Sequence, residues 1–144
     1  DRSMDCSSLK KLIECKDGNI TVMYKSPRCL RDRFYLVYMI VFGDGSYYIG
    51  KSNVGYQRMQ FHCKTKLGKV KDNYLPKLAS AFKKNDDFSI YSLSEINSKD
   101  EPDENDFLAV FQPPLNTNLC QQSKPYGNGR IKAVQIFNKI NNKQ

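Results

Sequence analysis

The feature that most constrains the fold is an apolar run that meets a tight-turn sequence and returns as a second short strand. Residues 34–42 read FYLVYMIVF, and after Gly43-Asp44-Gly45 the chain continues with SYYIG at residues 46–50. Two glycines around an aspartate supply the positive φ angles that short hairpin turns need. Because the first strand is apolar nearly throughout, we expect it to be covered on both faces, near the centre of a sheet.

The segments on either side of this hairpin alternate between helix-like and strand-like patterns. Residues 74–84 carry apolar side chains at helical spacing, and residues 88–93 alternate as a strand does. A helix begins near Pro102 and ends before Pro113 and Pro114, because the residue before a proline disfavours helical angles. The sequence also predicts a helix over residues 7–14, a strand over residues 19–24, a helix from its cap Asn53 to about Cys63, a loop over residues 124–130 and a strand or helix over residues 131–140.

Length and cysteine usage limit the class of protein. A chain of 144 residues matches one domain with a modest core, so we expect a single α+β domain over residues 1–144. No apolar run approaches the ~18 to 20 residues of a membrane span, and the first fifteen residues lack the apolar core of a signal peptide. The five cysteines are scattered, with no C-x-x-C pair, which argues against a zinc site or a disulfide framework. We expect a cytoplasmic protein without a membrane partner.

Charge is distributed unevenly along the chain, whose net charge is +8. Residues 51–77 hold seven basic and one acidic side chain, and residues 121–144 hold five basic and no acidic ones. Residues 95–106 reverse the sign, with six acidic and one basic side chain. Two basic zones around an acidic patch fit a protein that binds a polyanion and places carboxylates near it, although a solvated basic surface gives the same counts.

Several polar residues follow the hairpin at spacings that suggest a shared site. Arg58 and His62 are four residues apart, so both project from one face of the predicted helix, directly after Lys51. Glu104 lies in the first turn of another predicted helix, twelve residues before Asn116. Each also has an ordinary structural explanation, such as a solvated arginine, a packed histidine or a carboxylate that favours a helix N-terminus.

Taken in order, these residues and the hairpin resemble the GIY-YIG nuclease superfamily. LVYMI resembles the first motif, with Leu36 where glycine is usual, and YYIGK contains the second motif intact. RMQFH resembles the Arg and His of the family's helix, and ENDFLAVFQPPLN resembles the last part, where a Glu opens a helix and a Pro-x-x-Asn ends it. The resemblance covers residues 35–117, which leaves residues 1–34 as an N-terminal extension and residues 118–144 as a basic C-terminal extension.

The resemblance implies a small central three-stranded antiparallel sheet flanked by helices, with strands near residues 35–42, 46–50 and 88–93. It also implies an endonuclease that hydrolyses DNA phosphodiester bonds and needs a divalent metal ion, Mg²⁺ or Mn²⁺. Restriction, phage and mobile-element endonucleases are the expected kinds, and a homodimer or higher oligomer would bring two active sites to the two strands. The alternatives are a toxin or secreted effector nuclease acting on DNA or RNA, and a nucleic-acid-binding module without activity.

The resemblance assigns catalytic roles to matching positions in the hairpin and the helix after it. Tyr38 would be the general base that activates water, and Tyr48 would touch the phosphate or its water. Arg58 would neutralise the charge that builds on the phosphate. His62 would hold or relay a proton at the site.

The remaining roles concern the metal and the frame of the site. Glu104 would be the sole protein ligand of the metal, with Glu101 as the alternative if the helix begins one turn earlier. Asn116 would tie the last segment to the site, and Gly50 would be structural there. Tyr47 would be packing, because successive side chains of a strand face opposite sides.

These residue types suit the hydrolysis of an anionic phosphodiester. Arginine offers a permanent planar cation, and one carboxylate suits a Mg²⁺ ion that keeps most of its waters. Free tyrosine has a pKa near ~10, so about one in a thousand is ionised at pH 7. Lys51, Arg58 and a bound metal would each favour the phenolate of Tyr38, and lowering its pKa by ~2 units corresponds to about 2.7 kcal/mol. Lys51 would lower that pKa or accept the proton, unless it is only one more lysine of a basic stretch.

Basic residues are also expected to contact the nucleic-acid backbone, which would make binding strongly salt dependent. The segments 1–33 and 121–144 would supply such contacts or a subunit interface. The candidate contact residues are Lys51, Lys64, Lys66, Lys69, Lys71, Lys124, Arg130 and Lys132.

Overall fold

The protein folds into five strands and four helices across the residues that the structure describes. A computed structural model describes residues 4–25, 34–69, 75–96, 101–117 and 127–141. Its elements are β1 (Lys10–Lys16), β2 (Asn19–Val22), β3 (Tyr35–Phe42), β4 (Tyr47–Ser52), α1 (Gln57–Lys66), α2 (Pro76–Lys84), β5 (Phe88–Ile96), α3 (Glu104–Phe111) and α4 (Asn128–Ile140). All strands join one antiparallel sheet in the order β2-β1-β5-β3-β4.

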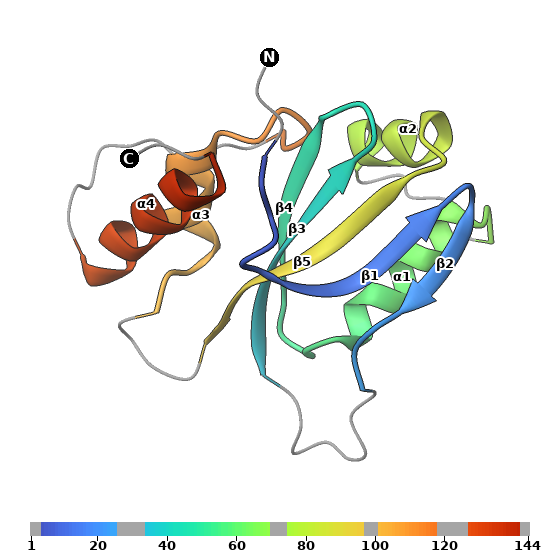
Figure 1. Ribbon diagram of the computed structural model, residues 1–144. Helices are drawn as coiled ribbons and strands as arrows, with labels where there is room; N and C mark the ends of the chain where they lie inside the picture. Colours follow the sequence, from blue (N-terminus) through green and yellow to red (C-terminus); the bar gives the residue numbers. More distant parts are fainter. Residues whose placement is uncertain (1–3, 26–33, 70–74, 97–100, 118–126, 142–144) are drawn as a thin grey trace.

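The sheet lies between two helical layers, with α1 and α2 on one side and α3 and α4 on the other (Figure 1). Tyr38 of β3 belongs to the buried cluster that includes Met59 of α1. Its neighbour Met39 points to the opposite face and packs with Phe107 of α3 and Ala133 of α4. The central strand β3 is therefore covered on both faces, as its continuous apolar run predicts.

The α+β class is confirmed, but the expectation of three strands is wrong. The N-terminal segment forms the hairpin β1–β2, and β1 pairs with β5, so the sheet has five strands. The helix expected over residues 7–14 is also wrong, because that segment holds the first half of β1. Leu12 and Ile13 are fully buried in this strand, and their burial against the sheet outweighs a weak local helical pattern.

Two further boundaries differ from the sequence-based expectation. Helix α1 begins at Gln57 with Tyr56 at its N-cap, so Asn53 does not cap it and lies in the turn that follows β4. Helix α4 begins at Asn128 and runs through the segment 131–140, which is therefore helical. The expected loop over residues 124–130 holds only for Gly127 among its described residues.

Strand β4 forms one edge of the sheet, and none of the described strands pairs with its outer side. Helix α1 follows β4 in the chain, and α3 contacts β4 from the other layer, so side chains from both layers can meet at this edge. Among the described helices, none combines the length and apolar character that a membrane crossing requires.

Candidate active site

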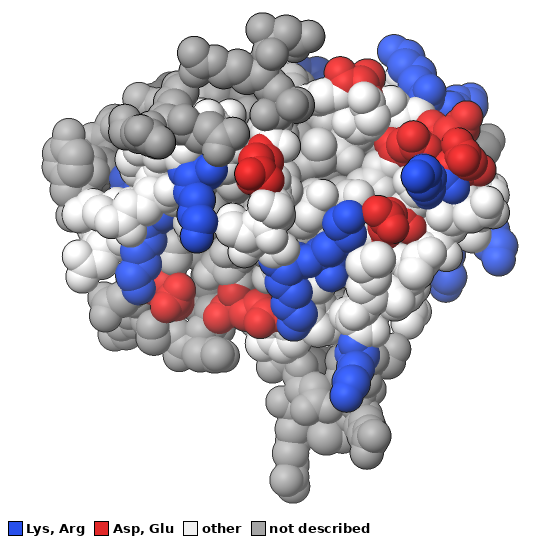
Figure 2. Space-filling view, viewed as in Figure 1, with Lys and Arg blue, Asp and Glu red and all other residues white. Residues whose placement is uncertain are grey.

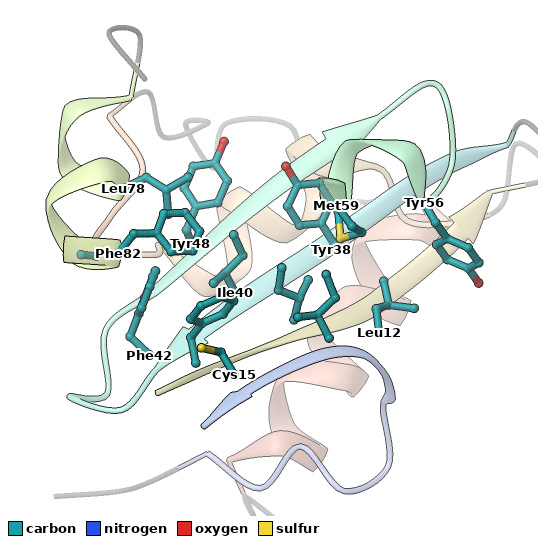
Figure 3. Packing of buried hydrophobic residues seen from close by; sticks show 14 of the residues in the cluster. Leu12, Cys15, Tyr38, Ile40, Phe42, Tyr48, Tyr56, Met59, Leu78 and Phe82 are labelled. Carbon is teal, nitrogen blue, oxygen red and sulfur yellow. The ribbon is translucent and has the colours of Figure 1, made fainter. Parts of the chain in front are cut away.

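Tyr38 and Tyr48 lie side by side on the face of the sheet that packs against α1 and α2. Antiparallel pairing sets Tyr38 opposite Gly50 and Ile40 opposite Tyr48, so the two tyrosines are diagonal neighbours. Their ring centroids are 6.4 Å apart. Figure 3 shows both rings in the buried cluster with their hydroxyl oxygens at its upper rim.

Gly50 provides the space in which the two tyrosine rings lie. A Cβ atom at Gly50 would stand 2.5 Å from the Tyr38 hydroxyl oxygen and 2.8 Å from Cε2 of Tyr48. Any larger residue would therefore displace at least one ring. The YIG motif needs glycine here because the two tyrosine rings lie so close to the Gly50 backbone. Its backbone angle is not the reason, since the φ of Gly50 is not positive.

The Tyr38 hydroxyl is held between two side chains of α1. It lies 2.7 Å from Nε2 of His62, and the Arg58 cation acts on the same hydroxyl by favouring its ionised form, which lowers its pKa. The direction of the bond to His62 follows from the tautomer of the imidazole: with Nε2 unprotonated, the Tyr38 hydroxyl donates to it. The spacing of four residues thus brings both side chains to Tyr38, as the helical pattern predicts.

Burial governs the protonation of this pair. Desolvation raises the pKa of Tyr38 well above its usual range, and the opposing effect of the Arg58 cation is smaller. The Arg58 cation acts in the expected direction, but burial outweighs it, so the net shift of the Tyr38 pKa is upward and not downward. Burial, and next Arg58, lower the pKa of His62 to about 3, so its imidazole is neutral at pH 7. Nδ1 of His62 is buried and has no hydrogen-bond partner among the described residues.

Tyr38, Tyr48 and Arg58 border one open pocket at the edge of the sheet that β4 forms. The pocket joins residues of both helical layers, which are far apart in sequence. Arg58 is exposed at its mouth, and its guanidinium lies over the ring of Phe61 at 4.9 Å from the centroid. The lining residues are Tyr38, Tyr48, Lys51, Ser52, Asn53, Val54, Arg58, Phe61, Leu75 and Glu104.

Glu104 reaches this pocket from the first residue of α3. Asp103 caps the helix, and its backbone amide is in turn bonded by the side chain of Asp106, so the start of the helix is fixed. Burial, and next the Glu104 carboxylate, raise the pKa of Tyr35. Burial raises the pKa of Glu104, and the Lys51 ammonium acts in the opposite direction. Lys51 therefore lies beside Glu104, and its charge acts on this carboxylate.

The donor set fits a hard divalent cation that keeps most of its water. Among the described residues there is no cluster of three or more His, Cys, Asp or Glu side chains that could hold a metal ion. One half-buried carboxylate next to an open pocket suits Mg²⁺ or Mn²⁺ with water and phosphate as the other ligands, and does not suit a closed zinc site. The alternative ligand Glu101 precedes the helix and contacts Lys132 at 3.5 Å.

Asn116 completes the outer edge of β4. Its side-chain oxygen accepts from the backbone amide of Ile49 at 2.9 Å, and its amide nitrogen donates to the Ile49 carbonyl at 2.7 Å. The side chain thus replaces a neighbouring strand at this position. On the opposite face from Tyr48, Tyr47 donates its hydroxyl proton to the Phe111 carbonyl at 2.7 Å and packs against α3.

With this geometry established, comparison with known proteins identifies the family. A family model described as the GIY-YIG catalytic domain matches residues 34–113, more than half of the chain. The chain belongs to the GIY-YIG nuclease superfamily. No curated protein and no solved structure matches it.

The matched region of this GIY-YIG protein holds the whole pocket but not the whole fold. Tyr38, Arg58 and Glu104 lie inside it, whereas Asn116, the hairpin β1–β2 and helix α4 lie outside. Leu36, at the position where the family pattern has glycine, is fully buried and pairs with Ser52. It contributes to the core and not to the pocket lining.

The candidate nucleic-acid contacts fall in different environments. Lys64 and Lys69 are exposed on and after α1. The Lys66 ammonium turns inward and donates to the Phe82 carbonyl at 2.9 Å and the Asn85 carbonyl at 2.7 Å, so it caps the end of α2. Arg130 and Lys132 form ion pairs with Asp106 and Glu101, and Lys71 and Lys124 lie outside the described residues.

Sequence reasoning did not select several residues that line the GIY-YIG pocket. Ser52 is buried, and its Oγ accepts from the Val54 amide at 3.2 Å. It shares a strand face with Tyr48 and Gly50, so the two-residue period of β4 would have found it. Phe61 lies one turn after Arg58, a spacing at which helical side chains meet. Leu75 gives no such signal, because only tertiary packing brings it to the pocket.

Proposed function

We propose that this chain is a divalent-metal-dependent endonuclease that hydrolyses phosphodiester bonds in DNA. Membership of a nuclease family sets the general class of reaction. The observation that supports the proposal most is the single pocket that gathers Tyr38, Arg58 and Glu104 from three elements. A hydroxyl, a cation and a carboxylate around one open space are the groups that phosphodiester hydrolysis needs.

Arg58 and Lys51 would act on the charge of the substrate. The exposed guanidinium of Arg58 lines the same pocket as Tyr38 and would donate to phosphate oxygens there. Lys51 neighbours Glu104 and would help to bring the phosphate to the carboxylate. Glu104 would hold Mg²⁺ or Mn²⁺, and the bound ion would polarise the phosphate and stabilise the leaving oxygen.

Tyr38 and His62 would handle the proton of the attacking water. A standing phenolate is disfavoured, because burial raises the pKa of Tyr38. With Nε2 unprotonated, His62 would accept the Tyr38 hydrogen bond at 2.7 Å and orient the hydroxyl, but its lowered pKa makes the ring a poor final acceptor of the proton. The proton of water would pass to the Tyr38 phenolate, which the Arg58 cation favours. Tyr48 would orient the water or the phosphate from the neighbouring position.

Cleavage of a plasmid tests the proposal. The parent protein, incubated with Mg²⁺ or Mn²⁺, is expected to nick or cut DNA, and EDTA or Glu104→Gln should abolish cleavage. Glu101→Gln is the matched control and should stay active, because its carboxylate contacts Lys132. Absence of metal-dependent cleavage across several DNA and RNA substrates would reduce the protein to a binding module, and cleavage of RNA alone would favour a toxin or effector nuclease over a restriction, phage or mobile-element enzyme.

The identity of the base is tested by two matched variants. Tyr38→Phe removes the hydroxyl that contacts His62 and should lower the cleavage rate by about 100-fold or more. Tyr48→Phe should have a smaller effect on the rate. Equal activity of Tyr38→Phe and the parent would exclude Tyr38 as the base. The oligomeric state during cleavage, measured by light scattering with a duplex, tests whether two copies act on the two strands.

A further inference from the structure

Helix α4 lies outside the family match and packs tightly on the helix that carries Glu104. Its Ala133 is fully buried in the cluster on the α3 side of the sheet. Phe137 contacts Phe111 of α3 edge to face, with ring centroids 4.9 Å apart. Gly129 permits a close approach at the other end, because a Cβ there would stand 2.6 Å from Oδ2 of Asp106. The N-terminal turn of α4 is therefore in direct contact with the start of α3.

At that contact, one carboxylate serves two partners. Oδ2 of Asp106 accepts from the backbone amide of Asp103 at 3.1 Å and so closes the capping box of α3. Oδ1 of the same group accepts from Nε of Arg130 at 3.2 Å. Glu104 is the first helical residue, between Asp103 and Asp106 in sequence, so the direction of its side chain depends on how this cap is held.

We propose that Arg130 is a positioning residue for Glu104, which acts by orienting the Asp106 carboxylate that closes the cap of α3. The inference rests on the proposed role of Glu104 as the metal ligand. It also changes the role expected from sequence, in which Arg130 contacts nucleic acid. Only 14% of the Arg130 side chain and 22% of the Asp106 side chain are exposed, so the guanidinium is engaged inside the protein and little of it faces solvent.

A single metal ligand makes such support important. Glu104 is the one carboxylate among the described residues that line the pocket, so no second lining carboxylate would correct a shift of α3. Residues that orient a ligand typically change metal affinity by about 10- to 100-fold when they are removed. The neighbouring pair Lys132 and Glu101 is more exposed and longer, at 3.5 Å, and neither residue belongs to the capping box of Asp103 and Asp106. We therefore expect metal affinity to depend on Arg130 itself and not on the total positive charge of α4.

The experiment separates positioning from nucleic-acid contact. Mn²⁺ affinity is measured by electron paramagnetic resonance on the full chain, alone and with a nuclease-resistant phosphorothioate duplex. Duplex affinity is measured separately in EDTA over a range of salt concentrations. Arg130→Ala should weaken Mn²⁺ binding about tenfold or more and leave duplex affinity in EDTA unchanged. Lys139→Ala, which removes an exposed charge from the same helix, should change neither.

Conservative variants keep the proposal testable if Arg130→Ala is unstable. Arg130→Lys retains the charge but not the planar donor, and should restore only part of the Mn²⁺ affinity. Asp106→Asn should weaken Mn²⁺ binding as Arg130→Ala does, and the double variant should be no weaker than either alone. Unchanged Mn²⁺ affinity in Arg130→Lys and Asp106→Asn overturns the inference. So does a loss of duplex affinity in EDTA with a salt slope lower by about one, which marks a phosphate contact.

Failure of the inference and failure of the proposed function give different results. If Glu104→Gln binds Mn²⁺ as the parent does, the proposed metal site is wrong, and the inference falls with it. If Glu104→Gln and Arg130→Ala both lose Mn²⁺ but the parent cleaves no nucleic acid, the positioning role stands and the enzymatic proposal fails.

Discussion

Gly50 is the residue on which the arrangement of the two tyrosines most directly depends. A Cβ atom there would overlap the Tyr38 hydroxyl, at 2.5 Å. We expect Gly50→Ala to lower the free energy of unfolding by about 1–3 kcal/mol, as overpacking of a core does, and to reduce cleavage more than this loss explains. Chemical denaturation and plasmid nicking measure the two effects. Gly127→Ala is the control, because nothing lies within 4 Å of a Cβ at that position.

His62 makes stability depend on pH in a defined direction. Its folded pKa is about 3 and its unfolded value is near ~6.5, so between these values the unfolded chain binds one more proton. Unfolding free energy should therefore fall as pH falls from about 6.5 towards 3, by up to about 1.4 kcal/mol per pH unit from this group. In His62→Gln this part of the slope should disappear. Parent and variant with the same slope in urea titrations would contradict the burial of a neutral imidazole.

At the scale of elements, the exposed side of β4 depends on one amide side chain. Asn116→Ala leaves the amide and the carbonyl of Ile49 without their present partners, 2.9 and 2.7 Å away. The expected loss is about 1–3 kcal/mol of unfolding free energy, together with weaker cleavage because β4 carries Tyr48 and Lys51. Urea unfolding of this variant is compared with Asn105→Ala, an exposed position on α3. An equal and small effect in both variants would show that water replaces Asn116 at no cost.

The elements that the sequence predicts well are those whose pattern is both local and unambiguous. The apolar run of β3, its Gly-Asp-Gly turn and the amphipathic α2 each lie within two residues of the expected bounds. Residues 7–14 have apolar side chains at helical spacing, but most of them form β1 because this segment pairs with β5. That partner lies more than seventy residues later in the sequence. Strand pairing of that kind cannot be found from local propensity.

For the candidate site, the sequence predicted which side chains share a face, but not how deeply each one is buried. Period-two and period-four rules bring Tyr38, Tyr48, Arg58 and His62 to one face, and the structure places them around one hydroxyl. The sign of the Tyr38 pKa shift was not predictable, because burial depends on the whole core around the ring. The inward position of the Lys66 ammonium was not predictable either, because it donates to carbonyl groups at the end of another helix.

Across the whole molecule, charge differs between the segments around α1 and α2 and the segment around α3. The described residues 54–69 and 75–85, in and around α1 and α2, hold seven basic and no acidic side chains, whereas residues 101–117 around α3 hold four acidic and no basic ones. On the face seen in Figure 2, acidic and basic groups are interspersed instead. The pocket at the β4 edge is lined from the basic helix α1 and from the acidic start of α3. A polyanion would therefore approach from the side of α1 and α2, with its phosphate directed towards Glu104.

This approach predicts which lysines carry the salt dependence of binding. Lys64→Ala with Lys69→Ala should lower the slope of log affinity against log salt by about one for each phosphate that these lysines neutralise in the parent, measured in EDTA with a duplex. Lys16→Ala with Lys139→Ala, which removes an equal charge from β1 and α4, should leave the slope unchanged. A duplex that instead crossed α4 or the outer strands would reverse these results, because counterion release follows only the lysines that touch phosphate.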